Sequence, residues 1–251
     1  MALARFFVEQ LPAAGSFELD EDESRHASGV LRMSVDDACL AFDGRGGEAR
    51  CTVTRISRRA VELQVVERLD TNRELPKSIT IAVALPKGDR QKTLVDFLVQ
   101  LGVHAFQPLI TNRGVAQPVD AALVRLRRSV IESSKQCGRN QLMKILDPVN
   151  LTSLTQPSAE PTNICSDSSS QVRVLRVFAH PYGEVTPLSE LRSNVQSTES
   201  THVLIGPEGG FTEEEADSLC VAGWIAISLG PRILRVEVAA THVASWLAEV
   251  G

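Results

Sequence analysis

Strand-like and helix-like segments alternate from residue 78 to the end of the chain. SITIAVAL (78–85) is a continuous apolar run, which is typical of a strand buried on both faces. The stretch from Asp89 to Gly102 then places apolar residues at helical spacing, at Leu94, Phe97, Leu98 and Leu101. The same order returns with HAFQPLI, a helix that we expect Asp120 to cap, and the later segments RVLRVFAH, THVLIG and WIAISLG. Because such helices carry the chain back between strands, the pattern predicts an α/β fold with a parallel sheet.

Short strand candidates fill the first 70 residues: RFFVEQ, DACLAF, EARCTVTRI and AVELQVV. The glycine-dense segment 43–47 predicts a hairpin turn, and SRHASGVLRM predicts one helical turn. Short strands of this kind favour a small β-barrel. The pattern changes near Leu75, so we expect domains over residues 1–73 and 77–251. Residues 152–171 are rich in Ser, Thr and Pro and predict a surface loop or a mobile segment.

The charge of the chain is unevenly distributed. The formal net charge is −5, which does not favour a nucleic-acid-binding protein. However, residues 77–150 carry a net charge of +6 between acidic segments of −4 and −7. This basic segment is either a surface for a polyanion or a set of solvated helix faces.

Several classes of protein are disfavoured by simple patterns. The sequence has no apolar run of membrane-spanning length, and its first residues do not resemble a signal peptide. The five cysteines lack CxxC spacing, and the five histidines lack the spacing of metal ligands. We therefore expect a cytoplasmic protein with free thiols, no metal site and no membrane segment.

A Gly/Pro turn with one acid, IGPEGGFTEEE, follows the apolar run that ends at Ile205. Thr212 and Glu215 have the spacing of a capping box, so a helix is expected to begin there. The acidic first turn would repel phosphate, and the phosphate-binding glycine motifs are absent from the sequence. The turn therefore predicts a site for a ligand that is neutral or cationic, with Glu208 facing a positive charge or a sugar or base edge. The alternative is a tight strand–helix connection with no ligand.

A second turn of the same plan, SLGPRILR, closes the chain before its last helix. Two such turns after parallel strands lie at the same edge of a sheet and can form a crevice. AHPYGE (179–184) is a candidate for a third, where His180 either borders the pocket or has a capping or surface role.

These motifs resemble one family closely. LIGPEGGFTEEEA, followed by SLGPRILR-x-E, is similar to the RsmE family of 16S rRNA uracil-N3 methyltransferases, in the SPOUT superfamily. RFFV, RHASGVLRM, FDGRGGE, ALPKGDR, LGVHAFQPLITNR and SSKQCGRNQ fall in the family's order. The resemblance implies an N-terminal PUA-like β-barrel and a C-terminal SPOUT domain with a deep trefoil knot. It also implies S-adenosyl-L-methionine as cofactor, a homodimer, and N3 methylation of a uridine in the rRNA of the small ribosomal subunit.

The resemblance also implies roles for residues of this chain. Glu237 or Glu208 is the expected proton acceptor, and Arg235, Arg113 or Arg139 would stabilise the uracil anion. Arg5, Arg113 and Arg139 are expected to contact RNA. The expected cofactor-binding residues lie in the two Gly/Pro turns and the strand before the first: Leu204, Gly206, Pro207, Glu208, Gly209, Gly210, Leu229, Gly230, Arg232, Ile233 and Leu234.

Two segments depart from the family pattern. In the helix after Asp89, Phe97, Val99 and Gln100 stand where the family commonly has a basic residue, a threonine and an acidic residue. Val236 and Val238 stand where members of the family usually have threonine, so two hydroxyl groups are missing. This leaves open a divergent protein that binds RNA or S-adenosylmethionine without turnover. A third possibility is methylation of a different RNA site, such as a ribose hydroxyl.

Overall fold

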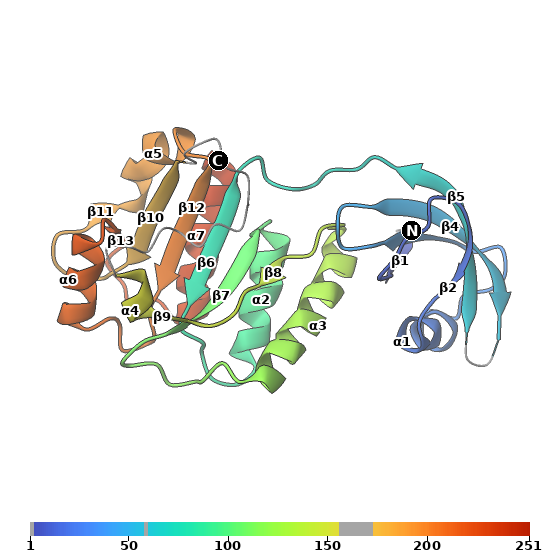
Figure 1. The fold of residues 1–251 in the computed structure, drawn as a ribbon, viewed down its shortest axis with the longest axis horizontal. Helices are drawn as coiled ribbons and strands as arrows, with labels where there is room; N and C mark the ends of the chain where they lie inside the picture. The colour runs from blue at the N-terminus through green and yellow to red at the C-terminus, as the bar shows by residue number, and fades with distance from the viewer. Residues whose placement is uncertain (1–2, 58–59, 156–172) are drawn as a thin grey trace. The chain divides into compact units, whose positions relative to one another are not determined.

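The computed structural model describes residues 3–57, 60–155 and 173–251, and they divide into two compact units (Figure 1). One unit comprises Met1–Glu74 and Ile131–Leu142, and the other comprises Leu75–Val130 and Met143–Gly251. No local pattern in residues 131–142 predicts that they return to the first unit. Residues 156–171 of the predicted surface loop lie outside the described residues.

The first unit contains a five-stranded sheet in the order β1-β3-β4-β5-β2. Its strands are β1 (Ala4–Phe7), β2 (Gly15–Glu18), β3 (Ala38–Phe42), β4 (Glu48–Ile56) and β5 (Val61–Leu69). Strands β3, β4 and β5 pair antiparallel in sequence, whereas β1 lies parallel to β3. The hairpin turn between β3 and β4 is confirmed: the carboxylate of Asp43 accepts hydrogen bonds from the backbone amides of Arg45 and Gly47, at 2.8 and 2.9 Å.

Of two small elements in this unit, the sequence predicted one and not the other. Strand β2 was not predicted, because GSFE is short and pairs only with one neighbour, β5. The helical turn was predicted and is confirmed, as α1 (Glu21–Arg25) followed by a π-helical turn (His26–Val30). Asp20 caps α1 by accepting a hydrogen bond from the amide of Glu23.

Two cysteines of the first unit serve as core residues, whereas Cys137 is exposed. Cys39 and Cys51 are free thiols that are fully buried among Phe6, Val53 and Leu63. Burial raises the pKa of Cys39 to about 12 and that of Cys51 to about 11, so both stay protonated at neutral pH. Cys165 lies outside the described residues.

The second unit contains a parallel sheet, which confirms the predicted α/β class. Its strands run in the order β11-β13-β10-β12-β6-β7-β8, and β9 also pairs with β7. Every strand pairing recorded in this sheet is parallel. The strands are β6 (Ser78–Val83), β7 (Ala105–Ile110), β8 (Lys144–Ile145), β9 (Val149–Asn150), β10 (Val174–Ala179), β11 (Thr186–Pro187), β12 (Ser200–Ile205) and β13 (Ile225–Ser228).

Helices connect and cover these strands (Figure 1). They are α2 (Arg90–Gln100), α4 (Leu151–Leu154), the 3-10 turn η2 (Leu188–Leu191), α5 (Arg192–Gln196), α6 (Glu213–Val221) and α7 (Val236–Val250). A further helix, α3 (Asp120–Cys137), begins in the second unit, and its residues from Ile131 onward belong to the first. Helix α7 packs on β6 and β12 and against α2, so the last helix lies next to the first helix of this unit.

The apolar face of α2 differs from the one predicted. Leu94 and Leu98 are buried as expected, but Phe97 is 43% exposed. The buried face is completed instead by Val95 and Val99. The sequence allowed both stripes, and packing against α7 selected the one with the valines. Asp120, expected as a cap, is instead the first residue of α3.

Candidate active site

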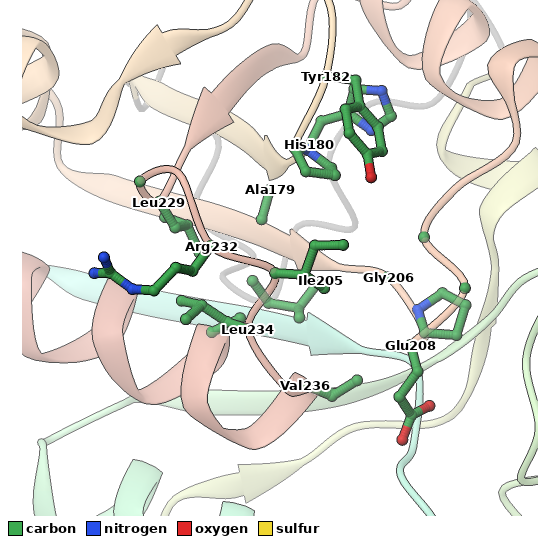
Figure 2. A pocket seen from close by; sticks show the side chains of 17 residues that line it. Ala179, His180, Tyr182, Ile205, Gly206, Glu208, Leu229, Arg232, Leu234 and Val236 are labelled. Carbon is green, nitrogen blue, oxygen red and sulfur yellow. The ribbon is translucent and has the colours of Figure 1, made fainter.

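Three loops meet in one pocket of the second unit (Figure 2). They follow β10, β12 and β13, which are adjacent parallel strands, so their C-terminal ends lie at one edge of the sheet. The crevice predicted from the two Gly/Pro turns is therefore formed, and AHPYGE supplies the third wall. The lining residues are Ala179, His180, Pro181, Tyr182, Ile205, Gly206, Pro207, Glu208, Gly209, Gly210, Leu229, Gly230, Arg232, Ile233, Leu234, Val236 and Ala239.

The loop after β12 is held in a tight conformation. Gly210 has a φ of +67°, which favours glycine. A Cβ atom on Gly206 would lie only 3.1 Å from the ring of Phe211. The predicted capping box is confirmed, since the Thr212 side chain accepts from the amide of Glu215 and the Glu215 carboxylate accepts from the amide of Thr212. These contacts fix where the loop after β12 ends and helix α6 begins.

Neighbouring residues brace this loop from the segment after β7. The second carboxylate oxygen of Glu215 accepts a hydrogen bond from the backbone amide of Asn112 at 2.9 Å. Arg113 donates from Nη1 to the carbonyl oxygens of Gly209 and Phe211, at 2.7 and 3.4 Å. The structure thus brings Arg113 to the rim of the site, with two backbone carbonyls of the loop as its partners.

Glu208 was predicted to face a positive charge, and the structure supplies one from the protein. Arg90, at the start of α2, places Nη1 2.9 Å from Oε1 of Glu208. The same Nη1 lies 3.8 Å from Oε2 of Glu237, in the first turn of α7. Arg90 was not among the predicted site residues. A signal existed, because Arg90 follows β6, the sheet neighbour of β12, and strand ends that share an edge bring their loops together.

Glu237 is a buried carboxylate next to the pocket. Its neighbours Val236 and Ala239 line the pocket, although Glu237 itself does not. Within the described part of the chain, its Oε2 is buried without a hydrogen-bond partner. The 3.8 Å contact with Arg90 is an ion pair beyond hydrogen-bond range, so this oxygen keeps unused capacity to accept.

The loop after β13 presents apolar side chains and open backbone groups. Gly230 has a φ of +104°, and Leu234 lines the pocket. The guanidinium of Arg232 extends outward from the loop (Figure 2). Across the described residues, the backbone amides of Ile233 and Leu234 have no hydrogen-bond acceptor. Unpaired amides in a loop are available to a ligand.

Not every predicted site residue lines the pocket. Leu204 is buried in β12, behind the lining residues. Arg235 is exposed at the N-cap of α7 and does not line the pocket. Of the two valines that depart from the family pattern, Val236 lines the pocket, whereas Val238 does not and is 47% exposed.

His180 and Tyr182 form one wall of the pocket. Of the two alternatives that the sequence left for His180, the structure has the one in which it borders the pocket, whereas Tyr182 was not singled out. Their ring centroids lie 6.4 Å apart in an edge arrangement, and Tyr182 is 65% exposed. Nδ1 of His180 is buried without a hydrogen-bond partner in the described structure. Burial lowers the pKa of His180 below its ordinary value, so the ring is neutral at pH 7.

Arg5 and Arg139 belong to the first unit, and carboxylates of that unit engage both. Arg5 pairs with the fully buried Glu48, and its Nη2 donates to the carbonyl oxygen of Arg139 at 3.1 Å. Arg139 is buried and donates from Nε to Glu74 at 2.8 Å. Arg73 donates to Glu48 and to the carbonyl oxygen of Gly138, at 3.1 and 2.8 Å. These contacts attach residues 138–139 to the first unit, and the RNA contacts of Arg5 and Arg139 stay a prediction.

The described residues contain neither a candidate metal site nor a membrane-spanning helix. Over residues 3–57, 60–155 and 173–251, no group of three or more His, Cys, Asp or Glu side chains could hold a metal ion. In the same ranges, no helix is long and apolar enough to cross a membrane.

Comparison with known proteins identifies the family. Residues 73–248 match a model described as an RNA methyltransferase domain, and residues 19–66 match an RNA methyltransferase PUA domain. A Bacillus subtilis (strain 168) protein named ribosomal RNA small subunit methyltransferase E is 30% identical, over 97% of this chain and 95% of its own length.

Solved structures agree over nearly the whole length. A Legionella pneumophila methyltransferase with bound cofactor SAM matches with a TM-score of 0.86 and 28% identity, covering 100% of this chain and 99% of that one. A Neisseria gonorrhoeae ribosomal RNA small subunit methyltransferase E bound to S-adenosyl methionine matches with a TM-score of 0.85 and 25% identity, covering 98% and 97%. The chain belongs to the ribosomal RNA small subunit methyltransferase E family.

Proposed function

We propose that this protein transfers a methyl group from S-adenosylmethionine to N3 of a uridine in 16S rRNA. The observation that carries the proposal is the pocket built by three loops at one edge of the sheet, in a chain that belongs to an rRNA methyltransferase family. Related structures with S-adenosylmethionine bound support the choice of cofactor.

The lining of the pocket fits this cofactor. Ile205, Leu229 and Leu234 offer apolar surface to an adenine ring, and the unpaired amides of Ile233 and Leu234 offer donors to its ring nitrogens. S-adenosylmethionine carries a sulfonium and an ammonium but no phosphate. A pocket with the carboxylate of Glu208 in its wall suits such a ligand better than a nucleotide with phosphates.

The finer features of the fold are part of the proposal. The first unit contains a PUA-like β-barrel of residues 1–73, and residues 77–251 form the methyltransferase domain, from which residues 131–142 join the first compact unit. The loops after β12 and β13 belong to a deep trefoil knot of the SPOUT type. The protein acts as a cytoplasmic homodimer on the small ribosomal subunit, and the basic charge of residues 77–150 faces the RNA.

The proposed mechanism assigns a proton acceptor. The N3–H of uracil is a weak acid, so methylation at N3 requires loss of this proton before or during attack. Glu237 is the stronger candidate of the two carboxylates, since Glu208 already pairs with Arg90 at 2.9 Å and Oε2 of Glu237 has no hydrogen-bond partner in the described structure. Bound S-adenosylmethionine supplies the electrophilic methyl group.

The arginines have supporting roles in this mechanism. Arg113 holds the loop after β12, and its exposed position at the rim suits contact with the uracil oxygens or a phosphate of the substrate. Arg235 is exposed beside the pocket at the N-cap of α7 and is a second candidate for this contact. Arg5 and Arg139 are the remaining candidates for RNA contact, although both pair with carboxylates of the first unit.

A methyl-transfer assay tests the proposal. The purified protein is incubated with methyl-labelled S-adenosylmethionine and unmodified small ribosomal subunits, and the rRNA is digested to nucleosides for mass spectrometry. We expect label in N3-methyluridine, with Glu237→Gln strongly reduced in single-turnover rate and the exposed Glu249→Gln, on the same helix, unchanged. Label in a ribose or at another base atom would overturn the assignment of N3 and favour a different RNA site.

A second candidate function rests on Val236. This residue lines the pocket without the hydroxyl that the family usually has there, which favours a protein that binds the cofactor or RNA without turnover. Binding of S-adenosylmethionine with no methyl transfer to the ribosomal subunit would support this reading and overturn the first.

A further inference from the structure

The pocket has an acidic side chain whose charge is balanced from outside the pocket. Of the described residues that line it, Glu208 is the one with a carboxylate. Its partner, Arg90, does not line the pocket and reaches Glu208 from the first turn of α2 at 2.9 Å. Figure 2 shows Glu208 at the end of the pocket away from Arg232, whose guanidinium extends in another direction. Arg90 is therefore the basic group that faces this carboxylate.

Arg90 also joins elements that are far apart in the sequence. It stands at the start of α2, pairs with the loop after β12, and lies 3.8 Å from Glu237 at the start of α7. The guanidinium of Arg90 thus faces two carboxylates at the edge of the sheet where the pocket lies. Removing Arg90 would leave both without their counter-charge, whereas removing Glu208 would leave Arg90 facing Glu237 alone.

We infer that Arg90 is a positioning residue that sets how the pocket distinguishes a sulfonium ligand from the neutral thioether left after methyl transfer. The inference deepens the proposed function and rests on it. S-adenosylmethionine and S-adenosylhomocysteine have the same adenosine and amino-acid groups and differ by the methyl group and the positive charge on sulfur. Their affinity ratio therefore reports the electrostatic potential of the pocket with other contributions largely cancelled.

Charge balance predicts opposite changes for the two partners. In Arg90→Gln, the uncompensated carboxylates attract the sulfonium, so the affinity for S-adenosylmethionine rises relative to that for S-adenosylhomocysteine. In Glu208→Gln, the ratio falls. The side chains of Arg90 and Glu208 are 35% and 36% exposed, so solvent screens the effect. For partly solvated charges on opposite sides of the pocket, Coulomb's law gives an effect on the order of a two- to fivefold change in the affinity ratio of the two ligands.

The experiment is calorimetric titration of the full-length protein with each ligand at low ionic strength. The variants are Arg90→Gln, Glu208→Gln, the double variant and Arg90→Lys, which keeps the charge. Lys92→Gln is the matched control, because it removes one positive charge from an exposed position on the same helix. We expect opposite shifts in the two single variants, a ratio near the wild-type value in the double variant and in Arg90→Lys, and no change in the control.

A merely structural role for Arg90 would give a different result. Loosening of the loop would weaken the binding of both ligands equally and leave the ratio of their affinities unchanged. That outcome overturns the inference, while the proposed function stands. Shifts of the same sign in Arg90→Gln and Glu208→Gln would overturn it as well. If the wild-type protein bound neither ligand, the proposed function would fail and this inference with it. Should Arg90→Gln not fold, Glu208→Gln tests the electrostatic effect: its affinity ratio should fall at low salt, and this shift should disappear at high salt.

Discussion

The fully buried Glu48 of the first unit allows a quantitative prediction about Glu48→Gln. The carboxylate pairs with Arg5, whose side chain is 9% exposed, and with Arg73, whose side chain is 42% exposed. Glutamine keeps the shape of the side chain but removes its charge, so the Arg5 guanidinium stays buried without a counter-ion. Breaking a buried ion pair in this way costs about 3–5 kcal/mol, and the solvated pair with Arg73 adds little. We therefore expect the first unit to lose about 3 kcal/mol of stability.

Urea unfolding can report this loss separately for the two units. Both tryptophans, Trp224 and Trp246, belong to the second unit, so their fluorescence follows that unit, whereas far-ultraviolet circular dichroism follows both. With a denaturant slope of about 1.5 kcal/mol/M, a loss of about 3 kcal/mol lowers the midpoint by about 2 M. We expect the early part of the dichroism transition to shift by this amount and the fluorescence midpoint to stay in place.

A matched variant completes the test. Glu21→Gln removes a carboxylate from an exposed pair with Arg25 in the same unit, and we expect a change below about 0.5 kcal/mol. If Glu48→Gln shifted the midpoint no more than Glu21→Gln does, Arg5 would have to be solvated or paired elsewhere. Carboxylates would then not be what holds Arg5 and residues 138–139 in place.

Three further predictions concern the pocket and its sheet. Arg113→Met removes the donor to the carbonyls of Gly209 and Phe211, and we expect about fivefold weaker S-adenosylmethionine binding by calorimetry, with the exposed Arg128→Met unchanged. Val236→Thr restores a hydroxyl at the pocket wall and should raise the single-turnover rate of methyl transfer, whereas Val238→Thr, outside the pocket, should not; equal effects would contradict the assignment. Burial, and then the charge of Arg176, lower the pKa of His202 to about 4 from an ordinary 6.5. As the pH falls, the unfolded chain binds this proton before the folded protein does, so the free energy of unfolding should fall between pH 6.5 and about 4, by up to about 3 kcal/mol. In His202→Gln, the urea midpoint should fall less over this pH range. If it fell as much as in the wild-type protein, His202 would not be the source of the pH dependence.

Local patterns predicted most of the secondary structure correctly. The strands at 38–42, 48–56 and 78–83 and the capping box at Thr212 follow from short-range chemistry, since alternation, apolar runs and caps depend on neighbours in the chain. Strand β2 was missed because four residues with one paired neighbour carry little such signal. The exposure of Phe97 was missed because two apolar stripes were available on α2, and only packing against α7 distinguishes them.

Some features of the site likewise follow from local sequence, and others depend on the tertiary structure. The sequence by itself determined the two Gly/Pro turns, the acid in the first of them, and the parallel sheet that places both turns at one edge. Only the tertiary structure decided that Arg90 reaches Glu208, that Arg113 donates to Gly209, and that Glu48 engages Arg5. The reason is physical: turns and caps are set by the conformations of adjacent residues, whereas an ion pair between residues 118 positions apart, such as Arg90 and Glu208, exists only once the sheet has brought their strand ends together.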